Sequence, residues 1–266
     1  MLTEFVYRNG GRVVSHDQYV DHERGRYFTR LEWALADFRV PRAAIRDRLA
    51  EAAGPFELQF ELHFSDDVPR LAIFVSKLAH CLYDILGRWR SGEWRIDIPL
   101  VISNHEALSD VARRFDVEFL SFPIDPKNAR SQEARELALL SERGIELIVL
   151  ARYMQIVGPQ LVAAYPNRII NIHHAFLPAF PGARPYEAAH QRGVKIIGAT
   201  SHYVTDHLDA GPIIEQDVIR VSHATSVEEM IRLGRDLEKV VLARAIRAHV
   251  QRKVLVDDEG RTVIFG

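Results

Sequence analysis

From Leu71 onward, short apolar runs alternate with longer amphipathic segments, and this pattern limits the fold more than any other feature of the chain. Leu71–Val75 is continuously apolar, as is typical of a strand buried on both faces of a parallel sheet. We expect further strands at Arg95–Ile102 and Ile145–Leu150, and helices at Cys81–Arg90, Ala107–Phe115 and Gln132–Arg143. This repetition predicts an α/β fold with an open, doubly wound, mostly parallel sheet, which binds ligands beyond the carboxyl ends of its strands.

The first part of the chain has a different pattern. We expect strands at Arg12–Val20 and Arg26–Leu35, a helix from Pro41 to Gly54, and a strand at Phe56–Leu62. The order helix, strand, strand, helix, strand lacks only an opening strand to form a ferredoxin-like α+β domain. The predicted organisation is therefore a small domain over residues 1–64 with its first strand missing, a polar linker over 65–70, and a larger domain over 71–266.

The end of the chain contains two further elements. Ser226 and Glu229 have the spacing of a capping box, which predicts the start of a long helix that extends to about Val250. Val254–Gly266 is expected to form a terminal hairpin around Asp258 and Gly260.

Polar side chains gather where two apolar runs end. A short strand at Arg168–Ile170 leads to Asn171 and His173, which are two residues apart and so share one face of an extended chain. Asp209 lies on a glycine-bearing loop that follows the strand carrying His202. An amide, an imidazole and a carboxylate can together polarise a carbonyl, stabilise an oxyanion and orient a nucleophile. These residues predict acyl-group chemistry and leave the acceptor open. Taken singly, Asn171 is more typical of a turn or a helix cap, and His202 is as compatible with the core as with a pocket.

Several other classes of function are disfavoured. No His, Asp or Glu set has the His-Glu-x-x-His spacing of a metal site, so we expect no metal. The loop Ser76–Cys81 is not glycine-rich, which makes it a poor cradle for a phosphate or a dinucleotide. The 34 basic and 36 acidic residues nearly balance, so neither nucleic acid nor an anionic membrane is an expected partner.

The single cysteine and the start of the chain bear on location. Cys81 cannot form an internal disulfide, which fits a reducing compartment. The chain has no basic-then-apolar signal pattern at its start and no apolar run that approaches about 18 residues. We therefore expect a cytoplasmic protein.

At these residues the sequence resembles the folate-dependent formyltransferase superfamily, and most closely its hydrolytic branch. The resemblance is specific over Asn171–Tyr186, Gly198–Val204 and Leu208–Ile214. It implies a formyltransferase-like Rossmann variant preceded by an ACT-type regulatory domain. The catalytic residues that it implies are Asn171, His173 and Asp209. The substrate-binding residues that it implies, largely through backbone atoms around a pterin ring, are Tyr153, Met154, Gln155, Val157, His202, Asp206, His207 and Leu208.

The implied reaction is hydrolysis of 10-formyltetrahydrofolate to formate and tetrahydrofolate, without metal or cofactor, which would balance one-carbon pools for purine synthesis. In this hypothesis Asn171 donates to the formyl oxygen, a protonated His173 stabilises the oxyanion, and Asp209 orients His173 and the attacking water. The implied partners are the folate substrate and further copies of the chain, joined through the N-terminal domain.

Three alternatives stay open at this stage. One is a formyltransferase that acts on an amine without a phosphate, because the resemblance implies that the glycinamide ribonucleotide transformylases carry a glycine-rich phosphate loop where this chain has Ser76–Cys81. Another is a folate-binding protein that has lost turnover, which the intact Asn171, His173 and Asp209 disfavour. A Rossmann oxidoreductase is disfavoured because Gly-x-Gly-x-x-Gly is absent.

Two departures from the superfamily pattern limit what the resemblance implies. Ala175 stands where the superfamily often has serine, next to the catalytic residues. The opening strand of the small domain, and the turn that usually binds an effector, have no counterpart in the sequence. Effector binding is therefore not expected from the resemblance.

Overall fold

The computed structural model describes residues 1–123, 129–178 and 185–266. The chain forms two compact units, one of Met1–Asp67 with Val263–Gly266 and the other of Val68–Thr262. Residues 179–184, which belong to the longest motif of the resemblance, lie outside the described part of the chain.

The second unit is built on a seven-stranded sheet of order β5-β4-β3-β6-β7-β8-β9. Strands β3 to β7 are parallel, whereas β8 pairs antiparallel with both β7 and β9. This arrangement confirms the predicted mostly parallel α/β fold. The strands are β3 (Arg70–Val75), β4 (Asp97–Ser103), β5 (Glu118–Ser121), β6 (Leu147–Leu150), β7 (Ile169–His173), β8 (Ile196–Tyr203) and β9 (Ile213–Arg220).

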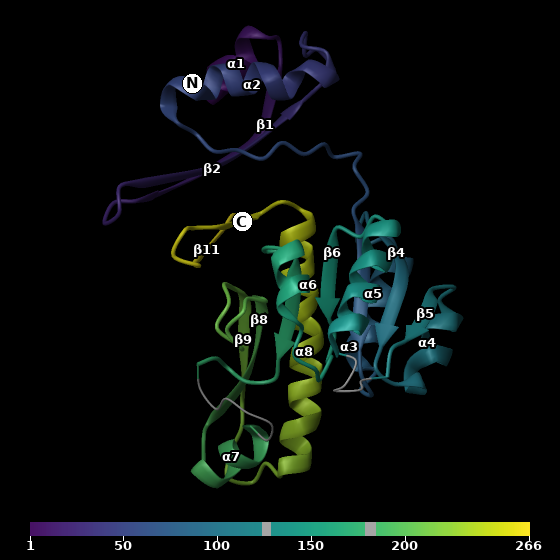
Figure 1. The fold of residues 1–266 in the computed structure, drawn as a ribbon. Coiled ribbons are helices and arrows are strands. Elements are labelled where there is room, and N and C mark those ends of the chain that lie inside the picture. Colours follow the sequence, from purple (N-terminus) through teal and green to yellow (C-terminus); the bar gives the residue numbers. More distant parts are fainter. Residues whose placement is uncertain (124–128, 179–184) are drawn as a thin grey trace. The chain divides into compact units, whose positions relative to one another are not determined.

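Helices cover both faces of this sheet, because the central strands are apolar on both sides. In β3, Leu71, Ile73 and Val75 enter a core cluster with α3 and α8, whereas Ala72 and Phe74 enter a second cluster with α5 and α6. Figure 1 shows the long helix α8, which contacts β7, β8 and β9. The helices are α3 (His80–Arg90), η3 (Glu106–Leu108), α4 (Ser109–Arg114), α5 (Ala129–Glu142), α6 (Pro159–Ala164), α7 (Pro185–Arg192) and α8 (Val227–Val250).

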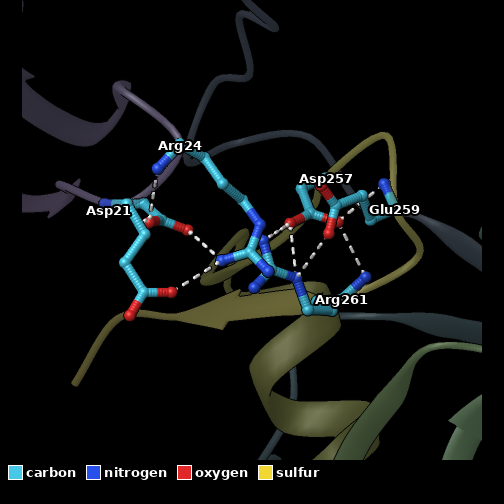
Figure 2. Close-up of polar contacts among 6 residues, drawn as sticks. Asp21, Arg24, Asp257, Glu259 and Arg261 are labelled. Atoms are coloured by element: carbon cyan, nitrogen blue, oxygen red, sulfur yellow. Dashed lines mark hydrogen bonds and ion pairs between the residues drawn. The ribbon is translucent and has the colours of Figure 1, made fainter.

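The predicted start of α8 and the predicted terminal hairpin are confirmed. The Ser226 side chain accepts a hydrogen bond from the Glu229 backbone N–H at 3.2 Å. Strands β10 (Val254–Val256) and β11 (Thr262–Ile264) pair in a two-stranded sheet. In the turn between them, Asp257 Oδ2 accepts from Arg261 Nε at 3.0 Å and from Nη2 at 2.7 Å (Figure 2).

The first unit contains a two-stranded antiparallel sheet and short helices. Asp21 closes the turn between the strands, because its Oδ1 accepts from the backbone N–H groups of Glu23 and Arg24 at 3.1 and 3.2 Å (Figure 2). The elements are α1 (Leu2–Arg8), β1 (Arg12–Asp21), β2 (Arg26–Ala34), η1 (Arg42–Ala44), α2 (Ile45–Ala53) and η2 (Gly54–Phe56).

The strand predicted over residues 56–62 is wrong. After α2 the chain forms η2, Glu57 adopts the left-handed conformation at φ +54°, and residues 58–64 belong to no strand. Exposure does alternate along this segment, as the sequence pattern predicts. Alternation alone does not make a strand, because a strand also needs a hydrogen-bonding edge. The sheet of this unit consists of β1 and β2 only, so a complete ferredoxin-like sheet is not formed by the described residues.

No helix in the described part of the chain is both long enough and apolar enough to cross a bilayer.

Candidate active site

Asn171 and His202 are paired across two antiparallel strands. Asn171 on β7 is the register partner of His202 on β8, and its Nδ2 lies 3.2 Å from His202 Nε2. His202 Nδ1 lies 2.9 Å from the backbone oxygen of Tyr203, so the ring proton of a neutral His202 is on Nδ1. His202 Nε2 then accepts a hydrogen bond from the Asn171 amide. The sequence does not reveal this contact, because it depends on the register of β7 and β8.

The loop after β8 brings Asp209 to the same place. Asp209 has φ +53°, a left-handed conformation that Asp tolerates better than most residues. Gly211 allows the loop to close on β8, because a Cβ atom there would lie 1.8 Å from the Tyr203 carbonyl oxygen. Asp209 Oδ2 lies 3.3 Å from His173 Nδ1, and Oδ1 lies 3.6 Å from His202 Nε2.

The structure therefore brings Asn171, His173 and Asp209 together, and adds His202 to them. His173 ends β7 with its side chain 8% exposed, and its Nε2 is buried and has no hydrogen-bond partner among the described residues. A buried ring nitrogen without a partner is available to a ligand or to a water molecule.

The charges at the site favour a neutral imidazole beside an ionised carboxylate. Burial lowers the pKa of His173, and the positive charge of Arg152 adds to this effect, while Asp209 opposes it. The pKa of Asp209 is lowered, chiefly by its interaction with His202. His173 is thus mainly neutral near pH 7, in contrast to the protonated form assumed from the sequence.

His174 packs behind His173. It is 8% exposed, its ring centroid lies 5.2 Å from that of His173, and that of Tyr186 on α7 lies 6.0 Å away. The pKa of His174 is lowered to about 4, chiefly by burial. His174 is therefore a neutral, packed residue, as expected from its position on the opposite face of the strand.

The first segment predicted to bind substrate follows β6. The Tyr153 ring packs edge-on against Phe74 in the core, with centroids 5.4 Å apart, so its side chain is directed to the core. Burial raises the pKa of the Tyr153 hydroxyl. Val157 packs partly against the same core cluster. Met154 is 53% exposed, and its backbone N–H donates to Ser76 Oγ at 3.0 Å.

The second such segment precedes Asp209. Asp206, His207 and Leu208 are exposed, and Leu208 is 71% exposed although it is apolar. By contrast, His202 is only 2% exposed, so its contacts are with Asn171 and Asp209.

Two supporting residues were missed from the sequence. Thr200 Oγ1 is fully buried and holds the chain after β7, donating to the Ala175 carbonyl at 2.9 Å and accepting from the Leu177 N–H at 3.1 Å. Ser76 Oγ donates to Asn104 Oδ1 at 2.7 Å and so ties the ends of β3 and β4 together. Ser76 directly follows β3, and that position was the available signal, whereas Thr200 lies inside β8 and had none.

A second polar cluster was also missed. His80, Cys81 and Glu238 place possible metal-binding atoms within 4.8 Å of one another. Burial raises the pKa of the Cys81 thiol well above the usual value. Glu238 is already paired with His80 and Arg152.

Comparison with known proteins shows which family the chain belongs to. Residues 69–246 match the formyl transferase family. A formyltetrahydrofolate deformylase from Synechocystis sp. (strain ATCC 27184 / PCC 6803 / Kazusa) is 53% identical over 264 residues, which cover 99% of this chain and 92% of that protein.

Solved structures agree with this match. The crystal structure of a formyltetrahydrofolate deformylase from Pseudomonas syringae pv. tomato str. DC3000 is 43% identical, with a TM-score of 0.97, over 100% of this chain and 89% of that one. Glycinamide ribonucleotide transformylase 1 from Symbiobacterium toebii is 32% identical, with a TM-score of 0.71, over 78% of this chain and 99% of that one. The chain belongs to the formyl transferase family, in the group of the formyltetrahydrofolate deformylases.

Proposed function

We propose that this protein hydrolyses 10-formyltetrahydrofolate to formate and tetrahydrofolate. The observation that carries the proposal is the convergence of Asn171, His173 and Asp209 at the ends of β7 and β8, in a chain closely related to formyltetrahydrofolate deformylases. These groups supply a hydrogen-bond donor for an oxyanion, a base and an orienting carboxylate.

His173 acts as the base in this mechanism. The Asp209 carboxylate faces Nδ1, which keeps the proton of the neutral ring on that atom and leaves a lone pair on Nε2. Water attacks the formyl carbon and gives a proton to His173 Nε2. The resulting imidazolium is stabilised by Asp209.

Asn171 stabilises the tetrahedral oxyanion. One N–H of its amide donates to His202, and the other is available to the formyl oxygen. When the intermediate collapses, the bond from carbon to N10 breaks and His173 returns its proton to N10. The products are formic acid, which ionises to formate, and tetrahydrofolate. No step needs a metal or a redox cofactor.

The pterin ring is held beside these groups by the two exposed segments. Met154, Ile156 and Leu208 expose 53%, 80% and 71% of their surfaces, and they offer apolar contacts to a flat ring. Backbone atoms of Gln155, Val157, Asp206 and His207 supply the polar contacts. Gln155 and Val157 are half-buried, whereas Asp206 and His207 are exposed.

Incubation of the purified protein with 10-formyltetrahydrofolate alone tests the function. We expect formate and tetrahydrofolate in equal amounts without any amine. An N-formylated amine that forms from an added amine, with no formate in its absence, would instead favour the transferase alternative. The role in one-carbon pools and the cytoplasmic location stay predictions.

The first unit is proposed to be an ACT-type domain that joins copies of the chain. Its hairpin exposes Val14, Tyr19 and Tyr27 at 59%, 47% and 45%, and residues 58–64 belong to no strand. Exposed apolar side chains on a small sheet are typical of an association surface. Light scattering on the full chain should give a mass of two or more copies; a monomer at micromolar concentration would contradict this.

A further inference from the structure

Glu238 is a buried carboxylate on α8 that contacts side chains from three other parts of the fold. Its side chain is 1% exposed. Oε1 accepts from the Tyr186 hydroxyl of α7 at 3.1 Å, and Oε2 lies 2.7 Å from Nε2 of His80, the first residue of α3. Arg152 Nε, which follows β6, lies 3.5 Å from the same Oε2. Burial alone would raise the pKa of Glu238, but His80 and Arg152 outweigh it and lower the pKa, so the carboxylate is ionised.

Two local features of the fold accommodate this network, and both are unfavourable in themselves. Arg152 adopts φ +64°, a left-handed conformation that strains any side chain other than glycine, asparagine or aspartate. Gly234 lies inside α8, where a Cβ atom would be 1.9 Å from the Tyr186 hydroxyl oxygen. Glycine weakens a helix interior, and a buried ion pair is rarely a net source of stability. The network is therefore better explained by function than by stability.

The network lies where a doubly wound sheet binds ligands. The strand order reverses between β3 and β6, and the crevice beyond the carboxyl ends of two such strands is the usual ligand site. His80 follows β3 and Arg152 follows β6, so their side chains occupy this crevice with Glu238.

The same crevice borders the catalytic histidine. The Tyr186 ring is next to His174, which is next to His173 on β7. Arg152 is 10% exposed, its Nε has no hydrogen-bond partner among the described residues, and its charge lowers the pKa of His173. An acceptor amine that approached the formyl group from β3 and β6 would meet this network first.

We propose that Arg152 and Glu238 determine the specificity of the reaction: their ion pair, held by His80 and Tyr186, fills the acceptor position and restricts the nucleophile to water. This inference rests on the proposed hydrolysis. In a transferase, an amine nitrogen would attack the formyl carbon, the bond to N10 would break, and one proton would move from the amine to N10. The network blocks the approach of an amine, but it does not prevent formyl transfer itself. Removal of a side chain from the network should therefore admit a small amine.

The test is a partition experiment with glycinamide, an amine without a phosphate. The wild type, Arg152→Gly and Arg152→Lys are each given 10-formyltetrahydrofolate and the same glycinamide concentration. Formate and N-formylglycinamide are then quantified. Glycine suits the left-handed conformation at position 152, so Arg152→Gly empties the position without backbone strain. Arg152→Lys is the matched control, because it keeps a positive charge on a long side chain.

The wild type and Arg152→Lys should give formate with little amide. Arg152→Gly should raise the ratio of amide to formate by about tenfold or more, and this ratio does not depend on how much enzyme is active. His80→Ala, which opens the network from α3, should raise it in the same direction. If neither Arg152→Gly nor His80→Ala gives a higher ratio of amide to formate than the wild type, whatever their rates, the inference would be overturned. A wild type that releases no formate without amine would instead overturn the proposed hydrolysis.

Discussion

Asn171 and His202 form a hydrogen-bonded pair across β7 and β8, with 3.2 Å between Nδ2 and Nε2. The second ring nitrogen of His202 is fixed by the Tyr203 carbonyl at 2.9 Å. The pair sets the rotation of the Asn171 amide, because only its nitrogen can donate to His202. The amide is then held in place before substrate arrives, which is the condition for effective stabilisation of an oxyanion.

Loss of the His202 ring should slow the reaction, because the Asn171 amide would no longer be held in its orientation. We expect His202→Leu to lower kcat by about 10- to 100-fold with little change in KM, because an unoriented donor stabilises the transition state less than a fixed one. His202→Gln places an amide oxygen near Asn171 and should recover part of the rate. Steady-state formate release measures both variants. An unchanged kcat in His202→Leu would show that Asn171 needs no orientation.

Asn171, His173 and Asp209, the three residues proposed to be catalytic, should each be necessary for turnover. Asn171→Asp removes the N–H donor in a side chain of nearly the same shape, and we expect kcat to fall by about 10²–10³. His173→Ala and Asp209→Ala should each abolish measurable turnover, since the base or its orienting carboxylate is lost. Single-turnover formate release is the measurement. Normal activity in any of these variants would remove that residue from the mechanism.

The pH profile should reflect a neutral His173. The active form is unprotonated, so kcat/KM falls as the pH falls through the His173 pKa. Because burial lowers that pKa, the acid limb should lie below the ordinary histidine value of about 6.5. The negative charge of Asp209 raises the pKa of His173, so Asp209→Asn should move its NMR titration to lower pH. Asp206→Asn, on the exposed part of the same loop, is the control and should not move it. An acid limb above 6.5 would contradict the mechanism.

The sequence predicts the strands that carry this site better than the side-chain contacts within it. The apolar run in β3 and the spacing of Asn171 and His173 are local features, so periodicity alone reveals them. The segment over residues 58–64 alternates like a strand but pairs with no strand of the described residues, and pairing is not a local property. Glu238 illustrates the same limit, because it is one of four acidic residues in a 24-residue helix and looks like part of a solvated face. Its burial depends on His80, Arg152 and Tyr186, which are distant in sequence.

The buried His174 should make the fold sensitive to acid. Its pKa is about 4 in the folded protein and about 6.5 in an unfolded chain, so the unfolded chain binds more protons and stability falls as the pH drops from 6.5 to 4. The loss from this residue is about 3 kcal/mol, at about 1.4 kcal/mol for each unit of pKa. Urea unfolding across this pH range measures it. In His174→Gln, which cannot titrate, the pH dependence should be smaller by about that amount; equal slopes would show that His174 is already protonated in the fold.

The loop that carries Asp209 should tolerate no side chain at Gly211. In Gly211→Ala a Cβ atom would lie 1.8 Å from the Tyr203 carbonyl oxygen, so the loop must move and carry Asp209 away from His173. We expect a fall in kcat of about 10²-fold, since a small misplacement of a catalytic group costs this much. Gly87→Ala on α3 is the control, because a Cβ atom there meets nothing within 4 Å. It should leave kcat unchanged and stabilise the protein by about 0.5–1 kcal/mol. Equal rates in the two variants would contradict the placement of Asp209.

In the proposed reaction, water that is activated by His173 is the acceptor of the formyl group from the folate. The most direct test is to incubate the protein with 10-formyltetrahydrofolate in water enriched in oxygen-18, without any amine, and to analyse the formate by mass spectrometry. The mechanism predicts formate with one oxygen-18 atom, in an amount equal to the tetrahydrofolate formed, and none from His173→Ala. Formate without the label, or no formate until an amine is added, would contradict it.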